Sequence, residues 1–84
     1  MATYFYSKPT VTYAKGTALE QKITFWKTFL SAHPTYFAGW IELAKLSLKS
    51  GDTKTADASY VNAARINPNS EEITNLAKEL ENHP

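Results

Sequence analysis

The chain has 84 residues, of which 43% are hydrophobic and 13% aromatic, a composition that predicts one small globular domain and excludes a disordered chain. Its net charge of +1 gives no electrostatic reason to bind nucleic acid or an anionic membrane, and the absence of cysteine excludes a disulfide framework and a thiolate metal site. No apolar run approaches the ~20 residues that span a bilayer, and residues 1–10 lack a signal-peptide pattern, so we expect a cytoplasmic or otherwise soluble protein.

Charge is distributed unevenly along the chain. Residues 1–49 carry six lysines and two glutamates, for a net charge of +4. Residues 50–84 carry three basic and six acidic groups, for a net charge of −3. This polarity would assist head-to-tail association, although ordinary solvated helix faces are the simpler interpretation.

Residues 1–16 differ from the rest of the chain and predict an extended or flexible aromatic arm. The segment contains Pro9 and Gly16, which interrupt regular structure. An isolated hairpin is marginal in water, so we expect the arm to lie against the helices or a partner. The residues that favour extended structure are Tyr4, Phe5, Tyr6, Val11, Thr12 and Tyr13.

The first helix is predicted over residues 18–32. Thr17 and Glu20 match the capping-box pattern, in which each side chain satisfies a free backbone N–H group. Pro34 disfavours helical geometry in His33 and ends the helix there. The apolar face at helical spacing comprises Leu19, Ile23, Trp26, Phe29 and Leu30.

Three more helices are predicted, over residues 36–50, 53–66 and 70–82. The second ends at Gly51, because glycine accepts the left-handed conformation that terminates a helix. Asp52 or Thr53 caps the third. Asn69 followed by Glu72 is a second capping-box pattern and starts the fourth, which is apolar along one narrow stripe formed by Ile73, Leu76, Ala77 and Leu80.

A pattern with a 34-residue interval connects these helices, since His33-Pro34 and Asn67-Pro68 are separated by that distance. The pattern comprises Trp40, Leu43, Ala44, Ser47, Gly51, Ala56, Tyr60, Ala63 and Pro68. It resembles the tetratricopeptide repeat (TPR), W-x2-L-G-x2-Y followed by A-x3-F and P. Ala44 and Ser47 stand where the family has Gly and Tyr. The resemblance implies a short stack of antiparallel helices within residues 17–82: half a repeat, one full repeat and a capping helix.

The TPR resemblance also implies a function, which is to act as a non-catalytic scaffold that binds a peptide or helix of a partner protein in a groove. Ile41 and Lys45 stand where carboxylate-clamping members of the family have Lys and Asn, so a clamp for a peptide C-terminus is not implied. The groove is expected to have an apolar floor and a lysine rim, which suits an amphipathic helix or extended peptide. Its expected lining residues are Ala38, Ile41, Glu42, Lys45, Leu48 and Lys49.

Self-assembly is the alternative function. Repeat proteins commonly need ~3 repeats for stability, and this chain matches the motif once. A homo-oligomer, a structural spacer, or the soluble part of a larger and membrane-anchored protein therefore remains open, with exchange of the aromatic arm between protomers as one mechanism. The partner is accordingly another protein or a second copy of the chain.

Catalytic and cofactor chemistry find little support in the sequence. His33 and His83 both precede prolines at predicted helix ends, and no activated serine and carboxylate accompany them. Glycines are isolated, which excludes a phosphate-binding loop. Lysines interleave with aromatic residues before residue 28, yet no arginine or nucleic-acid motif occurs there. We expect no enzyme activity, metal, cofactor or nucleic acid.

Overall fold

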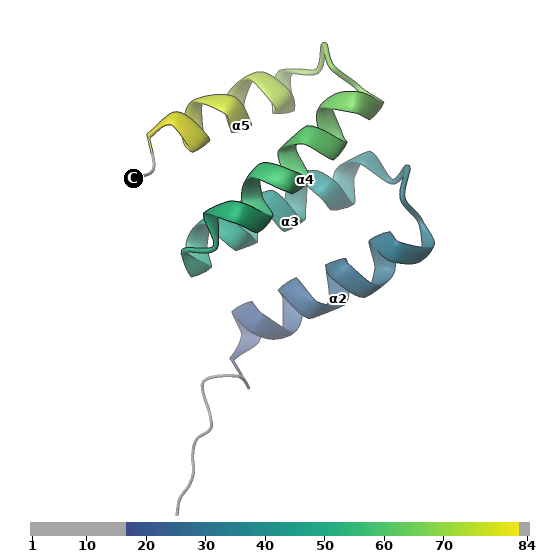
Figure 1. Cartoon of the computed structure of the whole chain (residues 1–84), viewed down its shortest axis with the longest axis vertical. Helices are drawn as coiled ribbons and strands as arrows, with labels where there is room; N and C mark the ends of the chain where they lie inside the picture. Colours follow the sequence, from purple (N-terminus) through teal and green to yellow (C-terminus); the bar gives the residue numbers. More distant parts are fainter. Residues whose placement is uncertain (1–16, 83–84) are drawn as a thin grey trace, which may run out of the picture.

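The computed structural model describes residues 17–82, which fold into four α-helices joined by short turns (Figure 1). The predicted all-α class with four antiparallel helices is confirmed. Each helix begins and ends within one residue of its predicted range. The predicted arm of residues 1–16 lies outside the described residues. The helices are α2 (Ala18–Ala32), α3 (Phe37–Ser50), α4 (Thr53–Ile66) and α5 (Glu71–Glu81).

Side-chain caps fix where three of these helices begin. The caps are Thr17 for α2, Asp52 for α4 and Ser70 for α5, which accept hydrogen bonds from the N–H groups of Glu20, Thr55 and Ile73 at 3.1, 3.1 and 3.2 Å. The prediction that Asn69 caps the last helix is wrong. Ser70 takes this position because its N–H donates to the carbonyl of Asn67, which extends the turn by one residue.

Gly51 ends α3 in the left-handed conformation, with φ of +87° and ψ of +5°. Its N–H group donates to the carbonyl of Leu48 at 3.1 Å, and the next N–H group, of Asp52, donates to Ser47 at 2.9 Å. These bonds satisfy two carbonyls at the helix end that have no partner within the helix. The chain therefore reverses in a tight turn and begins α4 antiparallel to α3.

The central helix is α3, which contacts α2, α4 and α5. Its small residue Ala44 is completely buried and lets α4 approach closely, where Ala56 and Ala63 are equally buried. Ile73 and Leu76 of α5 close the same core. By contrast, α2 contacts only α3 among the described helices, and its one buried residue is Leu30. The helix pair α3–α4 thus carries most of the core, and α2 lies at one end of the row.

Length and hydropathy together rule out a membrane-crossing helix within residues 17–82. The longest helix described, α2, has 15 residues, whereas crossing a bilayer takes about 20.

Candidate functional site

The six residues predicted to line a partner-binding groove divide into two groups. Ile41 and Leu48 are buried in the core against α4 and α5. The others lie exposed on the outer side of α3 and are Ala38, Glu42, Lys45 and Lys49. The expected apolar floor of that groove is therefore packed inside the protein. The prediction that this face binds a partner depends on the four exposed residues alone.

The repeat-pattern residues pack the helices together. Trp40 and Tyr60 are half-buried against the core, and the indole N–H of Trp40 donates to the carbonyl of Pro34 at 2.8 Å. Gly51 ends α3, and Pro68 lies in the exposed turn before α5. The remaining members of the pattern are buried: Leu43, Ala44, Ser47, Ala56 and Ala63.

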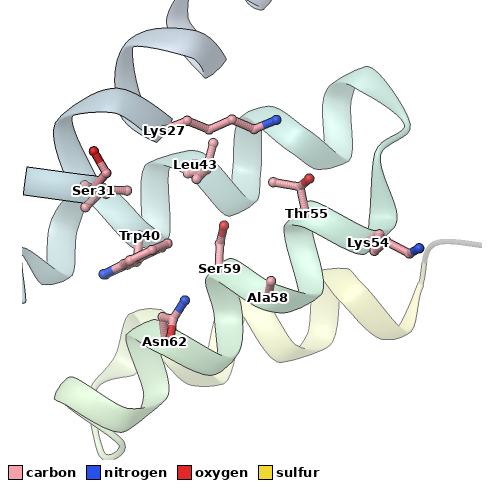
Figure 2. A pocket seen from close by; sticks show the side chains of 10 residues that line it. Lys27, Ser31, Trp40, Leu43, Lys54, Thr55, Ala58, Ser59 and Asn62 are labelled. Atoms are coloured by element: carbon pink, nitrogen blue, oxygen red, sulfur yellow. The ribbon is translucent and has the colours of Figure 1, made fainter. Parts of the chain in front are cut away.

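An open cavity of about 420 Å³ lies between α2 and α4, over α3, and we call it the lateral groove (Figure 2). It exists because α2 and α4 both pack on α3 without contacting each other. Its lining residues are Lys27, Leu30 and Ser31 from α2, Trp40 and Leu43 from α3, and Lys54, Thr55, Ala58, Ser59 and Asn62 from α4. None of the six residues predicted for the binding site belongs to it.

The floor of the lateral groove is apolar. Leu30 and Leu43 are buried there, and the ring of Trp40 forms one side. Because the indole N–H of Trp40 already bonds to Pro34, the ring offers an aromatic surface rather than a free donor. A ligand that entered the groove would therefore bury apolar surface against a preformed hydrophobic floor.

Ser59 places an unsatisfied hydroxyl group in this apolar setting. The residue is 1% exposed, and its Oγ atom has no hydrogen-bond partner. Figure 2 shows the hydroxyl directed from α4 toward the space beside Leu43 and Thr55. Buried polar groups in proteins are almost always hydrogen-bonded, so an exception requires an explanation. Ser47 is equally buried and also has no partner for its Oγ atom, but it does not line the lateral groove.

Two lysines bring positive charge to the lateral groove, Lys27 from α2 and Lys54 from the first turn of α4. Their influence is visible at the neighbouring Asp52. Hydrogen bonds from the hydroxyl and N–H groups of Thr55 hold the pKa of Asp52 below its ordinary value, and the charges of the two lysines lower it further. The lysines thus lie on opposite walls of the lateral groove, and the charges of both act on the Asp52 carboxylate.

A second cavity of about 330 Å³ adjoins the first at Lys27. It lies where the N-terminal half of α2 faces the turn between α3 and α4, and it is lined by Glu20, Ile23, Thr24, Lys27, Ser50 and Asp52. Acidic and basic groups alternate there over little apolar surface. It offers less area for an apolar ligand than the lateral groove does.

A cluster of rings that we call the aromatic face is formed by Phe25, Trp26 and Phe29 of α2 and by His33 and Tyr36 of the turn that leads to α3. Phe29 contacts all four other rings, either stacked or edge-on, and the closest is His33 with ring centroids 4.4 Å apart. Phe25 is 56% exposed and Tyr36 is 46% exposed. The cluster is thus ordered by ring contacts and still open to solvent.

Gly39 of α3 makes the inner side of the aromatic face possible. A methyl group at this position would lie 2.9 Å from Leu30 and Tyr36 and 3.0 Å from Trp26. The missing side chain therefore gives these three residues the room to pack against α3. The other side of the cluster faces away from the described helices, since α2 contacts no helix besides α3.

Comparison of the chain with protein-family models, curated proteins and solved structures finds no match. The four-helix all-α architecture is therefore described from the structure alone. Within residues 17–82, no group of three or more His, Asp or Glu side chains is arranged as metal ligands would be.

Sequence reasoning missed both surfaces. The repeat pattern specifies packing positions, so it gave no reason to select Ser59 or Asn62 between them. A signal for the aromatic face was available, because Phe25 next to Trp26 makes the aromatic arc of α2 wider than one neighbouring helix covers.

Proposed function

We propose that this domain is a non-catalytic protein-interaction module of the TPR type, and that its aromatic face binds a helix or extended segment of a partner protein. The 34-residue pattern supports the repeat type, since the pattern residues Ala44, Ala56 and Ala63 are packed where α3 and α4 meet. No catalytic group, cofactor or metal is part of the proposal.

One observation carries the proposal: large aromatic side chains are exposed together although ring contacts hold them in place. Solvent-exposed aromatic clusters are typical of interfaces, where aromatic residues supply much of the binding free energy. Phe25 and Tyr36 are the two most exposed large hydrophobic residues among those described. Because their neighbours already order them, little side-chain entropy is lost when a partner binds.

Self-assembly is the second candidate, with a second copy of the chain as the partner. It is favoured by the position of α2 at the end of the helix row, where a further helix can stack, and by the opposite net charges of the two halves of the chain. In this version the aromatic face of one copy packs on a helix of the next copy.

Photo-crosslinking in the native cells tests the proposal, with p-benzoylphenylalanine in place of Phe25 in the full chain. We expect a discrete adduct, and its mass shows whether the partner is another protein or a second copy. Adding Tyr36→Ser should remove the adduct. Adding Val61→Ser should not, because Val61 is equally exposed, at 45%, but lies on α4. If no adduct forms, or if both variants affect it equally, the aromatic face is not the interface.

A further inference from the structure

The lateral groove is a separate surface from the aromatic face, and its chemistry selects a narrower ligand. We propose that the lateral groove binds a tyrosine side chain of an acidic segment in a partner protein, with the phenol hydroxyl bonded to Ser59. This assignment does not depend on the aromatic face, since the two surfaces share no residue.

The apolar floor determines the body of the ligand. The apolar lining comprises the exposed Ala58, the half-buried ring of Trp40, and Leu30 and Leu43, which are buried beneath. An aromatic ring gains both burial and ring stacking on such a surface, which an unbranched aliphatic chain does not. A single aromatic side chain fills only part of the 420 Å³ volume, so the residues next to it also lie within the rim.

The hydroxyl of Ser59 determines the tip of the ligand. A phenylalanine or leucine would leave the Ser59 hydroxyl group as unpartnered as it is in the free domain, so it gains no hydrogen bond there. A carboxylate would have to shed its hydration over apolar residues. A tyrosine presents a hydroxyl at the end of its ring, and buried tyrosine hydroxyls usually have a hydrogen-bond partner. The serine hydroxyl can either donate to this group or accept from it.

The rim determines the sign of the flanking charge. Lys27 and Lys54 stand on opposite walls, and among the described residues no acidic one belongs to the lining of the lateral groove. The charged residues of the lining are thus both basic, which makes the rim positive. Such a rim attracts glutamate or aspartate beside the tyrosine and repels a basic segment. This is the reason to expect an acidic peptide.

Fluorescence anisotropy of a labelled peptide tests the assignment on the full chain. The probe is acetyl-Glu-Glu-Tyr-Glu-Glu-amide, and the comparison peptides replace tyrosine by phenylalanine or all glutamates by glutamines. Loss of the phenol hydroxyl should weaken binding about fivefold, the effect of one neutral hydrogen bond. Replacing the glutamates should weaken binding more at low salt than at high salt, because salt screens the charges.

Two serine variants make the test specific. In Ser59→Ala the tyrosine and phenylalanine peptides should bind equally. Ser47→Ala is the matched control, because it removes an equally buried and unpartnered hydroxyl outside the lateral groove and should preserve the difference. Equal binding of the two peptides to the unmodified chain, or a difference that survives Ser59→Ala, overturns the assignment. Absence of binding also overturns it.

The aromatic face serves as the remaining control. The double variant Phe25→Ser with Tyr36→Ser should bind the tyrosine peptide as the unmodified chain does. If this variant abolishes binding while Ser59→Ala has no effect, the peptide binds at the aromatic face and the lateral groove is not its site. A failure of the lateral groove is thereby distinguished from a failure of the proposed function.

Discussion

The indole N–H of Trp40 donates a hydrogen bond to the backbone carbonyl of Pro34 at 2.8 Å. This bond joins the first turn of α3 to the turn that follows α2, and it fixes the Trp40 ring at one side of the lateral groove. Trp40, a residue of the repeat pattern, therefore both stabilises the α2–α3 connection and shapes the lateral groove.

Trp40→Phe keeps an aromatic ring and removes the donor. We expect the free energy of unfolding to fall by about 1–2 kcal/mol, since the Pro34 carbonyl loses its partner and the smaller ring leaves space. Urea denaturation followed by circular dichroism measures this value. Stability equal to that of the unmodified chain would mean that water replaces the indole N–H at no cost.

Ser47→Ala and Ser59→Ala should each stabilise the free domain. Both hydroxyl groups are buried without a partner, so replacing them by hydrogen removes an unsatisfied group at little loss of packing. We expect a gain of about 1 kcal/mol for each, measured by thermal unfolding. Ser31→Ala is the control: Ser31 is exposed, its hydroxyl donates to the carbonyl of Thr28 at 2.7 Å, and its removal should change stability by less than about 0.5 kcal/mol. A loss of stability in both buried variants would show that these hydroxyl groups have partners in solution.

The helix bounds could be predicted because their signals are local. Thr17, Pro34 and Gly51 each act on backbone groups within one turn of themselves, so neighbouring residues contain all the information needed. The cap of α5 was predicted wrongly because two adjacent residues give the same local signal. Asn69 and Ser70 are both good caps, and the turn that starts at Asn67 decides between them.

Periodicity by itself could not predict the surfaces, because it identifies apolar arcs without showing what covers them. The apolar arc of α3 includes Ile41 and Leu48, and α5 packs over it. The arc of α2 includes Trp26 and Phe29, and only α3 covers part of it. Periodicity alone does not separate the two arcs. Phe25 widens the arc of α2, and the tertiary contacts show that this arc is the open one.

Gly39→Ala should destabilise the domain although alanine favours helix. The new methyl group would lie 2.9 Å from side-chain atoms of Leu30 and Tyr36, and Leu30 is buried and has little room to move. We expect overpacking of about 1–3 kcal/mol to exceed the gain of about 1 kcal/mol in helix propensity. Chemical denaturation measures the net loss, and changed near-ultraviolet circular dichroism should report the displaced rings. A more stable variant would show that the aromatic side chains move aside freely.

Asp52 should make stability depend on pH in the acid range. Its pKa in the folded domain lies below the ordinary 3.8, mainly because the Thr55 hydroxyl bonds to the carboxylate. A lowered folded pKa means that the contribution is present above the ordinary value and is lost as the pH falls through the folded value. Asp52→Asn retains a capping side chain without the charge. The difference in melting temperature between the two proteins should therefore be seen near neutral pH and disappear in strong acid. A difference that persists in strong acid would point to geometry rather than charge.

Variants of Leu48 and Lys45 should distinguish a core position of α3 from its predicted binding face. Leu48 is buried against α4 and α5, so Leu48→Ala should cost about 2–5 kcal/mol of unfolding free energy by leaving a cavity. Lys45 is exposed on the same helix, and Lys45→Ala should change stability by less than about 0.5 kcal/mol. Urea denaturation of both variants measures the contrast. Loss of partner binding in Leu48→Ala would then report unfolding, whereas the same loss in Lys45→Glu, at unchanged stability, would identify the outer side of α3 as a contact surface. Equal stability of the Leu48→Ala variant and the unmodified chain would instead require Leu48 to lie at the surface.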